Sequence, residues 1–201
     1  MVETIAPVVH GGRNKSYWLT VAAHTFGATL SGALFGALLG GAGRLLGAPW
    51  GTAGTVALAL VAGVYLLREA FRLPVPLPDL DKQVPDWWRT FYSPPIAGLL
   101  YGLGLGIGFL TFLTFSTYVA VAVGAVVSGD ALFGALLLGL FGFSRGLSVL
   151  VAARTTDADG PASKRDALEE MYEGPRPRFV NGAAVAAIAL GATAVGLASV
   201  V

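Results

Sequence analysis

The sequence contains no cysteine and little charge. None of its 201 residues is Cys, and only 12% are charged, against about 25% in an ordinary soluble domain. The lack of cysteine excludes disulfides, thiol redox chemistry and thiolate metal sites within the chain. The scarcity of charge, together with 55% hydrophobic residues and a mean hydropathy of +0.70, indicates an integral membrane protein.

Long apolar runs account for most of the chain. A membrane-spanning helix needs about 20 mainly apolar residues. Runs of this kind lie at residues 17–46, 50–67, 96–129, 131–153 and 179–201. We therefore predict an all-α fold, a single membrane domain over residues 1–201 with about five transmembrane helices. The first run is far longer than the apolar part of a cleaved signal peptide, so we expect it to be retained.

Basic residues lie almost entirely on one side of these predicted helices. Of the 13 Lys and Arg residues, only Arg44 and Arg145 fall outside the N-terminal segment and the loops 68–95 and 154–178. Loops rich in Lys and Arg stay in the cytoplasm. We predict a multi-pass protein of the cell membrane with a cytoplasmic N-terminus, both of these loops inside, and the C-terminus outside.

Two predicted spans are longer than the bilayer is thick. As straight helices, the runs 17–46 and 96–129 would extend about 45 Å or more, against a hydrocarbon core of about 30 Å. They must tilt, protrude or break. Glycines that permit a break lie late in the first run and early in the third, at Gly40, Gly41, Gly43, Gly102, Gly104, Gly106 and Gly108. Such breaks are where carriers place binding sites, whereas close helix packing is the alternative use of these glycines.

The two predicted cytoplasmic loops carry different signals. The first ends in an aromatic group that is typical of a membrane-interface belt, with partner docking as the alternative: Trp87, Trp88, Phe91 and Tyr92. In the second, Ser163 and Asp166 resemble a capping box and predict a short surface helix over residues 164–173.

Two ionisable residues lie within predicted spans, where such residues are functional candidates. His24 is a proton carrier, a haem or metal ligand, or a hydrogen-bonded structural residue. Arg145 lies about 12 Å from the cytoplasmic end of its helix. There it either extends to the headgroups or faces inward, holding carbonyl groups or an anion. Because no Asp or Glu falls within a predicted span, proton coupling is disfavoured.

Hydroxyl side chains gather in the stretch LTFLTFSTY, residues 110–118, inside the third predicted span. Threonines can bond back to the carbonyl four residues earlier and bend a helix. The stretch therefore predicts a kink or the wall of a polar cavity. The candidate cavity residues are Thr25, Thr29, Thr111, Thr114, Ser116 and Thr117, with His24 and Arg145.

Small residues recur every four positions in the last predicted span. Ala183, Ala187 and Gly191 form a pattern that favours close contact with another helix, either a partner protein's or a second copy's. The heptapeptide ALFGALL also occurs twice, at residues 33–39 and 131–137. That pairing is what an inverted repeat would produce, although residues 32–40 and 98–106, in parallel spans, match as well.

The second half of the chain resembles the membrane domain of the CcdA/DsbD cytochrome c biogenesis family. The resemblance rests on the glycines of residues 102–106, the hydroxyl stretch 110–118 and the segment 128–150, which includes Arg145. It implies a six-span inverted repeat with broken helices, each bearing one cysteine, and electron transfer by thiol–disulfide exchange. Hydroxyls occupy Thr114 to Thr117, where that cysteine would be expected, and Ser148 stands where a proline often follows the arginine. A hydroxyl cannot replace a thiolate, so the redox activity does not carry over.

The sequence leaves two main functions open, transport across the membrane and a non-catalytic accessory role. The main prediction is transport of a small solute or ion, because the resemblance extends to metabolite and ion carriers. The alternative is a non-catalytic accessory or assembly subunit of a membrane complex. A cofactor-binding subunit built on His24 is a weaker third option. We expect no catalytic residue, no cofactor, no metal and no nucleic-acid partner; the expected partners are the lipid bilayer and a membrane protein or second copy.

Overall fold

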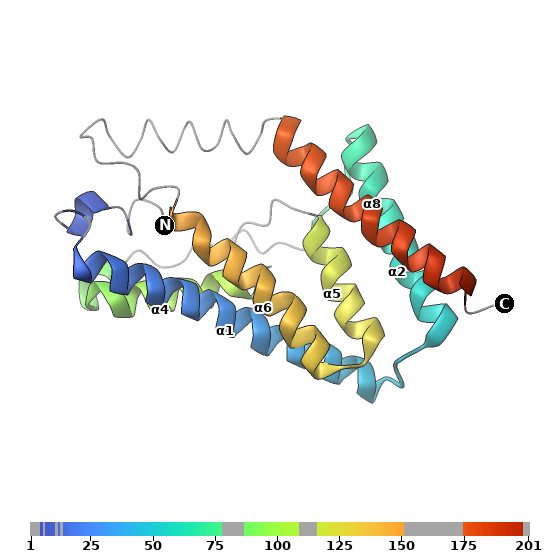
Figure 1. The fold of residues 1–201 in the computed structure, drawn as a ribbon, viewed down its shortest axis with the longest axis horizontal. Coiled ribbons are helices and arrows are strands. Elements are labelled where there is room, and N and C mark those ends of the chain that lie inside the picture. Colours follow the sequence, from blue (N-terminus) through green and yellow to red (C-terminus); the bar gives the residue numbers. More distant parts are fainter. Residues whose placement is uncertain are drawn as a thin grey trace. The chain divides into compact units, whose positions relative to one another are not determined.

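The computed structural model describes residues 5, 7–10, 12, 14–77, 87–108, 116–150 and 175–198. Within these ranges every regular element is a helix (Figure 1), which confirms the all-α prediction for the described residues. In chain order the elements are η1 (Pro7–His10), α1 (Lys15–Leu45), α2 (Gly51–Phe71), α3 (Trp88–Phe91), α4 (Pro94–Gly106), α5 (Thr117–Ser128), α6 (Ala131–Leu147) and α8 (Pro175–Ala198).

Among the residues that the structure describes, three helical segments are long and apolar enough to cross a membrane by length and composition: Lys15–Leu45, Gly51–Phe71 and Ala131–Leu150. Two shorter apolar helices, Thr117–Ser128 and Phe179–Ala194, lie within the last part of the third and within the fifth predicted spans. These helices fit a membrane bundle.

The two overlong runs behave differently. The first forms one uninterrupted helix, α1, of 31 residues. In the described part of the third run there are two helices, because α4 ends at Gly106 and α5 begins at Thr117. Gly108 has φ of +81°, a left-handed conformation that side chains with a Cβ rarely adopt. The chain therefore leaves the helical path at the glycines that the sequence marks.

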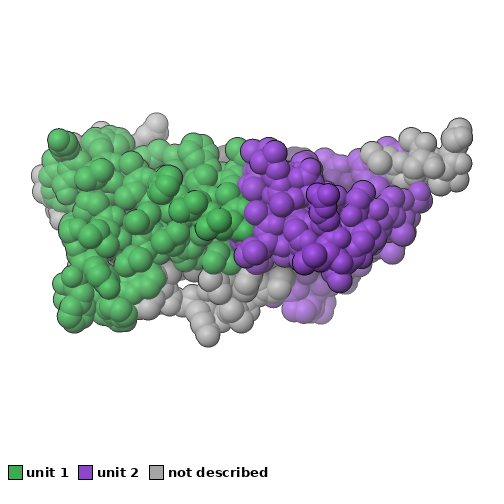
Figure 2. Space-filling view, turned by 90° about the horizontal axis from the view of Figure 1, so that it is seen from below, with its two compact units in different colours: residues 1–34, 79–112, 138–167 green, residues 35–78, 113–137, 168–201 purple. Residues whose placement is uncertain are grey.

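The chain divides into two compact units, coloured separately in Figure 2. Unit 1 comprises residues 1–34, 79–112 and 138–167, and unit 2 comprises residues 35–78, 113–137 and 168–201. Both α1 and α6 contribute residues to each unit.

In unit 1 the helices α1, α4 and α6 approach one another through glycine. In α4, Gly102 faces the carbonyl of His24 so closely that an added Cβ would overlap with it. Because Gly98, Gly102 and Gly106 face successive turns of α1, at Thr20, His24 and Ala28, the two helices run parallel. Glycines at a spacing of four form one stripe of a helix and let backbones touch.

The α6 helix packs on α1 in the opposite direction. In unit 1, Gly146 faces Thr25 and Gly142 faces Ala28. In unit 2, an added Cβ at Gly134 would overlap with the carbonyl of Gly36. These two glycines are the centres of the two ALFGALL segments. The repeated heptapeptides therefore pack against each other, which is a physical reason for the match independent of any duplication.

Unit 2 holds α2, α5 and α8 together through small side chains. Ala62 of α2, Ala120 of α5 and Val185 of α8 are fully buried against one another. The turn from α5 into α6 is set by two residues. Gly129, with φ of +62°, ends α5, and the Asp130 carboxylate accepts the backbone N–H groups of Leu132 and Phe133 at 2.8 and 3.1 Å.

Candidate functional site

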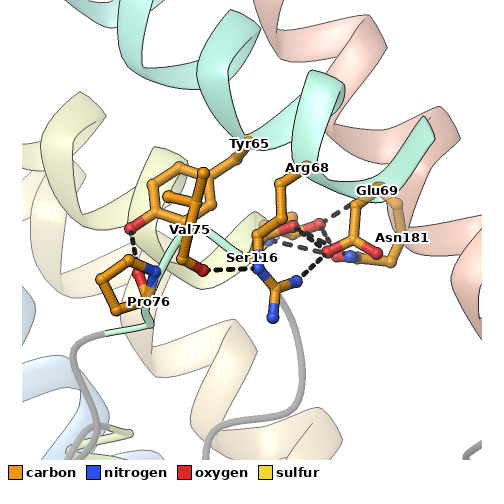
Figure 3. Close-up of polar contacts among 8 residues, drawn as sticks. Tyr65, Arg68, Glu69, Val75, Pro76, Ser116 and Asn181 are labelled. Carbon is orange, nitrogen blue, oxygen red and sulfur yellow. Dashed lines mark hydrogen bonds and ion pairs between the residues drawn. The ribbon is translucent and has the colours of Figure 1, made fainter. Parts of the chain in front are cut away.

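The most extensive polar group among the described residues lies in unit 2, where α2, α5 and α8 meet (Figure 3). We call it the Glu69 cluster: Arg68, Glu69, Ser116, Thr117 and Asn181. The hydroxyl of Ser116 donates to Glu69 Oε1 at 2.9 Å and accepts from the Asn181 side-chain amide at 2.9 Å. Arg68 forms an ion pair with the same carboxylate oxygen. One connected hydrogen-bond network thus joins three helices.

Three members of this cluster are shielded from solvent. The side chain of Glu69 is 7% exposed, Ser116 is fully buried and Asn181 is 5% exposed. A buried polar group costs free energy unless it is paired, and each of these three residues is paired. The cluster therefore selects one arrangement of α2, α5 and α8.

Asn181 also completes the start of α5. Ser116, the residue before the helix, makes no capping hydrogen bond with its own side chain. Instead, the Asn181 side-chain oxygen accepts the backbone N–H of Thr117 at 3.1 Å and also the Thr117 hydroxyl. The N-terminal end of a helix carries unsatisfied N–H groups and a partial positive charge. Here a residue of another helix satisfies one of those groups.

The segment after α2 is tied to the same place. Arg68 Nε donates to the carbonyl of Val75 at 2.8 Å, and the Tyr65 hydroxyl donates to the carbonyl of Pro76 at 3.2 Å. Figure 3 shows both contacts, with Arg68 lying between the Tyr65–Pro76 contact and Glu69. The helix α2 runs four residues beyond the predicted span 50–67. The prediction that no acidic residue lies within a span therefore needs correction, because Glu69 belongs to a helix that is long and apolar enough to cross a membrane.

In unit 1, Arg145 of α6 closes the C-terminal end of α4. Its Nη1 donates to the carbonyls of Leu105 and Gly108, each at 3.3 Å. The guanidinium also lies 5.8 Å from the ring centre of Phe141. The last carbonyls of a helix carry a partial negative charge, so a cation is the matching partner. The sequence allowed Arg145 either to extend to the headgroups or to face inward. In the structure the side chain faces inward and binds backbone carbonyl groups.

His24 is fully buried between α1 and α4. Its Nδ1 lies 3.2 Å from the carbonyl of Gly98 and, in the tautomer that donates to this acceptor, Nε2 carries the lone pair. Within the described part of the chain, His24 Nε2 has no hydrogen-bond partner, and no three His, Asp or Glu side chains lie close enough to hold a metal ion. Of the three roles that the sequence left open for His24, this geometry matches that of a hydrogen-bonded structural residue.

The other predicted cavity residues fall into separate groups. Thr25 and Thr29 belong to unit 1; Thr29 donates to the carbonyl of Thr25 at 2.8 Å. Ser116 and Thr117 belong to unit 2, in the Glu69 cluster. Thr111 and Thr114 lie outside the described residues, as does the helix predicted over residues 164–173. Of the predicted cavity residues that the structure describes, Ser116 and Thr117 therefore lie in one hydrogen-bond network. That network also contains Glu69 and Asn181, which were not predicted.

The small-residue stripe of the last predicted span faces away from α2. Ala183, Ala187 and Gly191 are exposed in unit 2, whereas Asn181 and Val185 face inward. An added Cβ at Gly191 would meet nothing within 4 Å. The contact between α8 and α2 is therefore made by a different face from the one that the four-residue spacing marks.

Two residues of the site were missed in the sequence. Glu69 lies just past the apolar run that defined its span, and Asn181 lies at the start of another. Each is a polar residue within one turn of an apolar run, and that position is a usable signal for both. Their pairing has no such signal, since it depends on how α2 and α8 pack.

The comparisons with known proteins give one consistent name. No protein-family model matches the chain, and no solved structure matches it. The methylamine utilization protein MauF of Paracoccus versutus is 33% identical over 154 residues, 75% of this chain and 56% of that protein. MauF of Paracoccus denitrificans is 32% identical over 76% of this chain and 56% of its own length. MauF of Methylophilus methylotrophus is 34% identical over 64% and 45%, respectively.

These relatives correct the family resemblance. They are named MauF and not CcdA or DsbD, so the assignment to the cytochrome c biogenesis family is wrong. Glycine and other small residues are common wherever membrane helices pack closely, so a glycine-rich stretch does not identify one family. The chain spans about half the length of the curated relatives it matches.

Proposed function

We propose that the chain is a non-catalytic accessory membrane protein of a methylamine utilization system. The name shared by its relatives supports the methylamine context. The carrying observation for the accessory role is that the chain's own side chains occupy both ends of the interrupted third span. Arg145 binds the end of α4, and Asn181 binds the start of α5.

The occupied ends matter because carriers use such ends for their ligands. In carriers with interrupted helices, the partial charges of the broken ends bind the transported ions. In unit 1 the guanidinium of Arg145 takes the position of a bound cation at α4. In unit 2 the Asn181 oxygen takes the position of a bound anion at α5. A transported ion would have to displace a bonded side chain in either place.

The close approach of the helices in unit 1 supports the same proposal. At Gly102, Gly106 and Gly142 even a methyl group would overlap with a backbone carbonyl of α1. A solute pathway between α1 and α4 or between α1 and α6 would require these backbones to separate. Packing of this kind favours a scaffold that holds a fixed shape.

The proposed role in methylamine utilization is tested by gene deletion in the source organism. We expect loss of growth on methylamine as the sole carbon source, with unchanged growth on an unrelated carbon source. Restoring the wild-type gene should restore growth on methylamine. Unchanged growth of the deletion strain on methylamine would contradict the proposal.

The accessory role is separated from transport by a flux measurement. Purified protein in phospholipid vesicles should take up labelled methylamine no faster than vesicles without protein. Affinity purification from gently solubilised membranes should in addition recover a second protein in fixed proportion. Protein-dependent methylamine uptake would favour the carrier that the sequence first suggests.

A further inference from the structure

An aromatic surface covers one end of unit 1. The ring of Trp87 contacts Phe91 and Tyr92, with ring centres 5.9 and 6.5 Å apart. All three side chains are exposed, by 52%, 76% and 42%. The neighbouring Trp88 lies 5.6 Å from the buried ring of Tyr101 in α4, which fixes this group of rings to the helix.

A second exposed tryptophan, Trp18, lies in α1 near the start of α4. Gly98, in the second turn of α4, faces Thr20 of α1. Trp18 is two residues before Thr20 and is 49% exposed. At about 1.5 Å per residue, Trp18 lies about 3 Å from this level along α1. Trp18 therefore lies at the level of the first turns of α4, the helix that the segment of Trp87, Phe91 and Tyr92 directly precedes.

The exposed surface of α1 changes character at Trp18. Before it, Asn14, Lys15 and Ser16 are exposed and polar. After it, the exposed side chains are large and apolar: Leu19 is 56% exposed, Phe26 62% and Leu30 39%. Tryptophan and tyrosine are enriched where a protein surface passes from water into lipid, and this change marks such a place.

We propose that the aromatic surface of Trp18, Trp87, Phe91 and Tyr92 binds the headgroup region of a phospholipid bilayer, which places the Arg145 contact with α4 near the bilayer centre. The occupant is lipid because the surface continues into the exposed apolar side of α1, where the alternative, a protein partner, would need polar rim residues below the rings.

The depth of Arg145 follows from the glycine contacts. The last residue of α4, Gly106, faces Ala28, ten residues beyond Trp18 and about 15 Å deeper along α1. Half of a hydrocarbon core is also about 15 Å. Unpaired carbonyls at that depth cost free energy, because no water is available to bond them. Arg145 is thus the positioning residue for a helix that ends inside the membrane.

Depth-dependent fluorescence quenching tests this placement. The chain has four tryptophans, so three are replaced by Phe to leave Trp18 or Trp87 alone. The proteins are reconstituted into phosphatidylcholine vesicles that carry bromine either near the headgroup end or near the tail end of the acyl chains. Both single tryptophans should lose more fluorescence to bromine near the headgroups.

A deeper tryptophan is the matched control. In a chain whose four tryptophans are all Phe, Phe26→Trp places one ring eight residues beyond Trp18, about 12 Å deeper. It should lose more fluorescence to bromine near the tail ends. Helical content by circular dichroism is compared with wild type, so that a misfolded variant is recognised and is replaced by Leu30→Trp.

Quenching of Trp87 by aqueous iodide and not by brominated lipid would overturn the proposal and indicate a surface for water or a partner. Equal depth profiles for Trp18 and the Phe26→Trp variant would also overturn it. The proposal rests on membrane location and not on the methylamine role. A failed quenching result therefore leaves the growth phenotype unaffected, and an absent growth phenotype leaves the quenching result unaffected.

Discussion

Asn181 of α8 accepts a hydrogen bond from the backbone N–H of Thr117, the first residue of α5, at 3.1 Å. The same side chain donates to Ser116, which donates to Glu69 of α2. One amide side chain thus connects a helix start, a hydroxyl and a carboxylate in three helices.

Removing the side-chain amide of Asn181 should lower the stability of unit 2. Asn181→Leu leaves the backbone N–H of Thr117 without its acceptor and removes one of the two hydrogen bonds of the Ser116 hydroxyl, which still donates to Glu69. An unsatisfied buried group costs about 1–3 kcal/mol. We expect a lower thermal unfolding temperature in detergent. Ala187→Leu, on the exposed face of the same helix, should change that temperature little. Equal effects of the two substitutions would contradict the assigned role.

The carboxylate of Glu69 should matter both as an acceptor and as a charge. Glu69→Gln retains an oxygen for the Ser116 hydroxyl but loses the ion pair with Arg68. Glu69→Leu loses both. Because hydrogen bonds to charged groups contribute about 1.5–3 kcal/mol, we expect the unfolding free energy to fall in the order wild type, Gln, Leu. Chemical denaturation in mixed micelles measures this order, and equal losses for Gln and Leu would mean that the Ser116 contact is unimportant.

The glycine contacts between helices should tolerate no methyl group. Gly102→Ala places a Cβ against the carbonyl of His24, whereas the same change at Gly63 of α2 meets nothing within 4 Å. Overpacking costs about 1–3 kcal/mol. Gly63→Ala should instead stabilise by up to about 1 kcal/mol, since glycine is a poor helix former. Thermal unfolding of the two variants, each compared with wild type, tests this prediction. An unchanged unfolding temperature for Gly102→Ala would mean that α1 and α4 can separate.

Arg145 should stabilise the folded protein and should have no role in the transport of methylamine. Arg145→Gln shortens the side chain and removes the charge that faces the Leu105 and Gly108 carbonyls. We expect a loss of about 2 kcal/mol in unfolding free energy and no change in vesicle permeability to methylamine. Arg145→Lys should recover part of the stability, because an ammonium also matches the end of a helix. An unchanged stability for Arg145→Gln would remove the positioning role.

His10 should make folding sensitive to mild acid. Burial lowers the pKa of His10 from its ordinary value of 6.5. Its ring lies edge-on to Tyr17, with centres 5.8 Å apart. Since the folded state binds the proton less readily than the unfolded state, His10 contributes stability above pH 6.5, and this contribution is lost as the pH falls through the folded-state pKa.

The comparison of wild type with His10→Gln measures this effect. Unfolding temperatures of the two proteins should converge or cross as the pH falls below 6.5, and an NMR titration of the His10 ring should give a pKa below that value. A ring that titrates above 6.5 would show that the burial is absent in solution.

Much of the fold could be predicted because it depends on local pattern. The apolar runs specified where α1, α2, α5 and α6 lie, and the glycines of residues 102–108 marked where the third span is interrupted. The positions of His24 and Arg145 within helices were also evident. These features follow from hydropathy and backbone freedom within about 20 residues of sequence.

The sequence by itself determined that this chain is helical, apolar and free of thiol chemistry. The tertiary structure alone decided what each polar residue meets: Arg145 the end of α4, Asn181 the start of α5, and Glu69 the hydroxyl of Ser116. Ser116 and Asn181 are 65 residues apart in the chain. Contacts at such separations depend on which helix faces pack together, and hydropathy within one helix carries no information about the face presented by another.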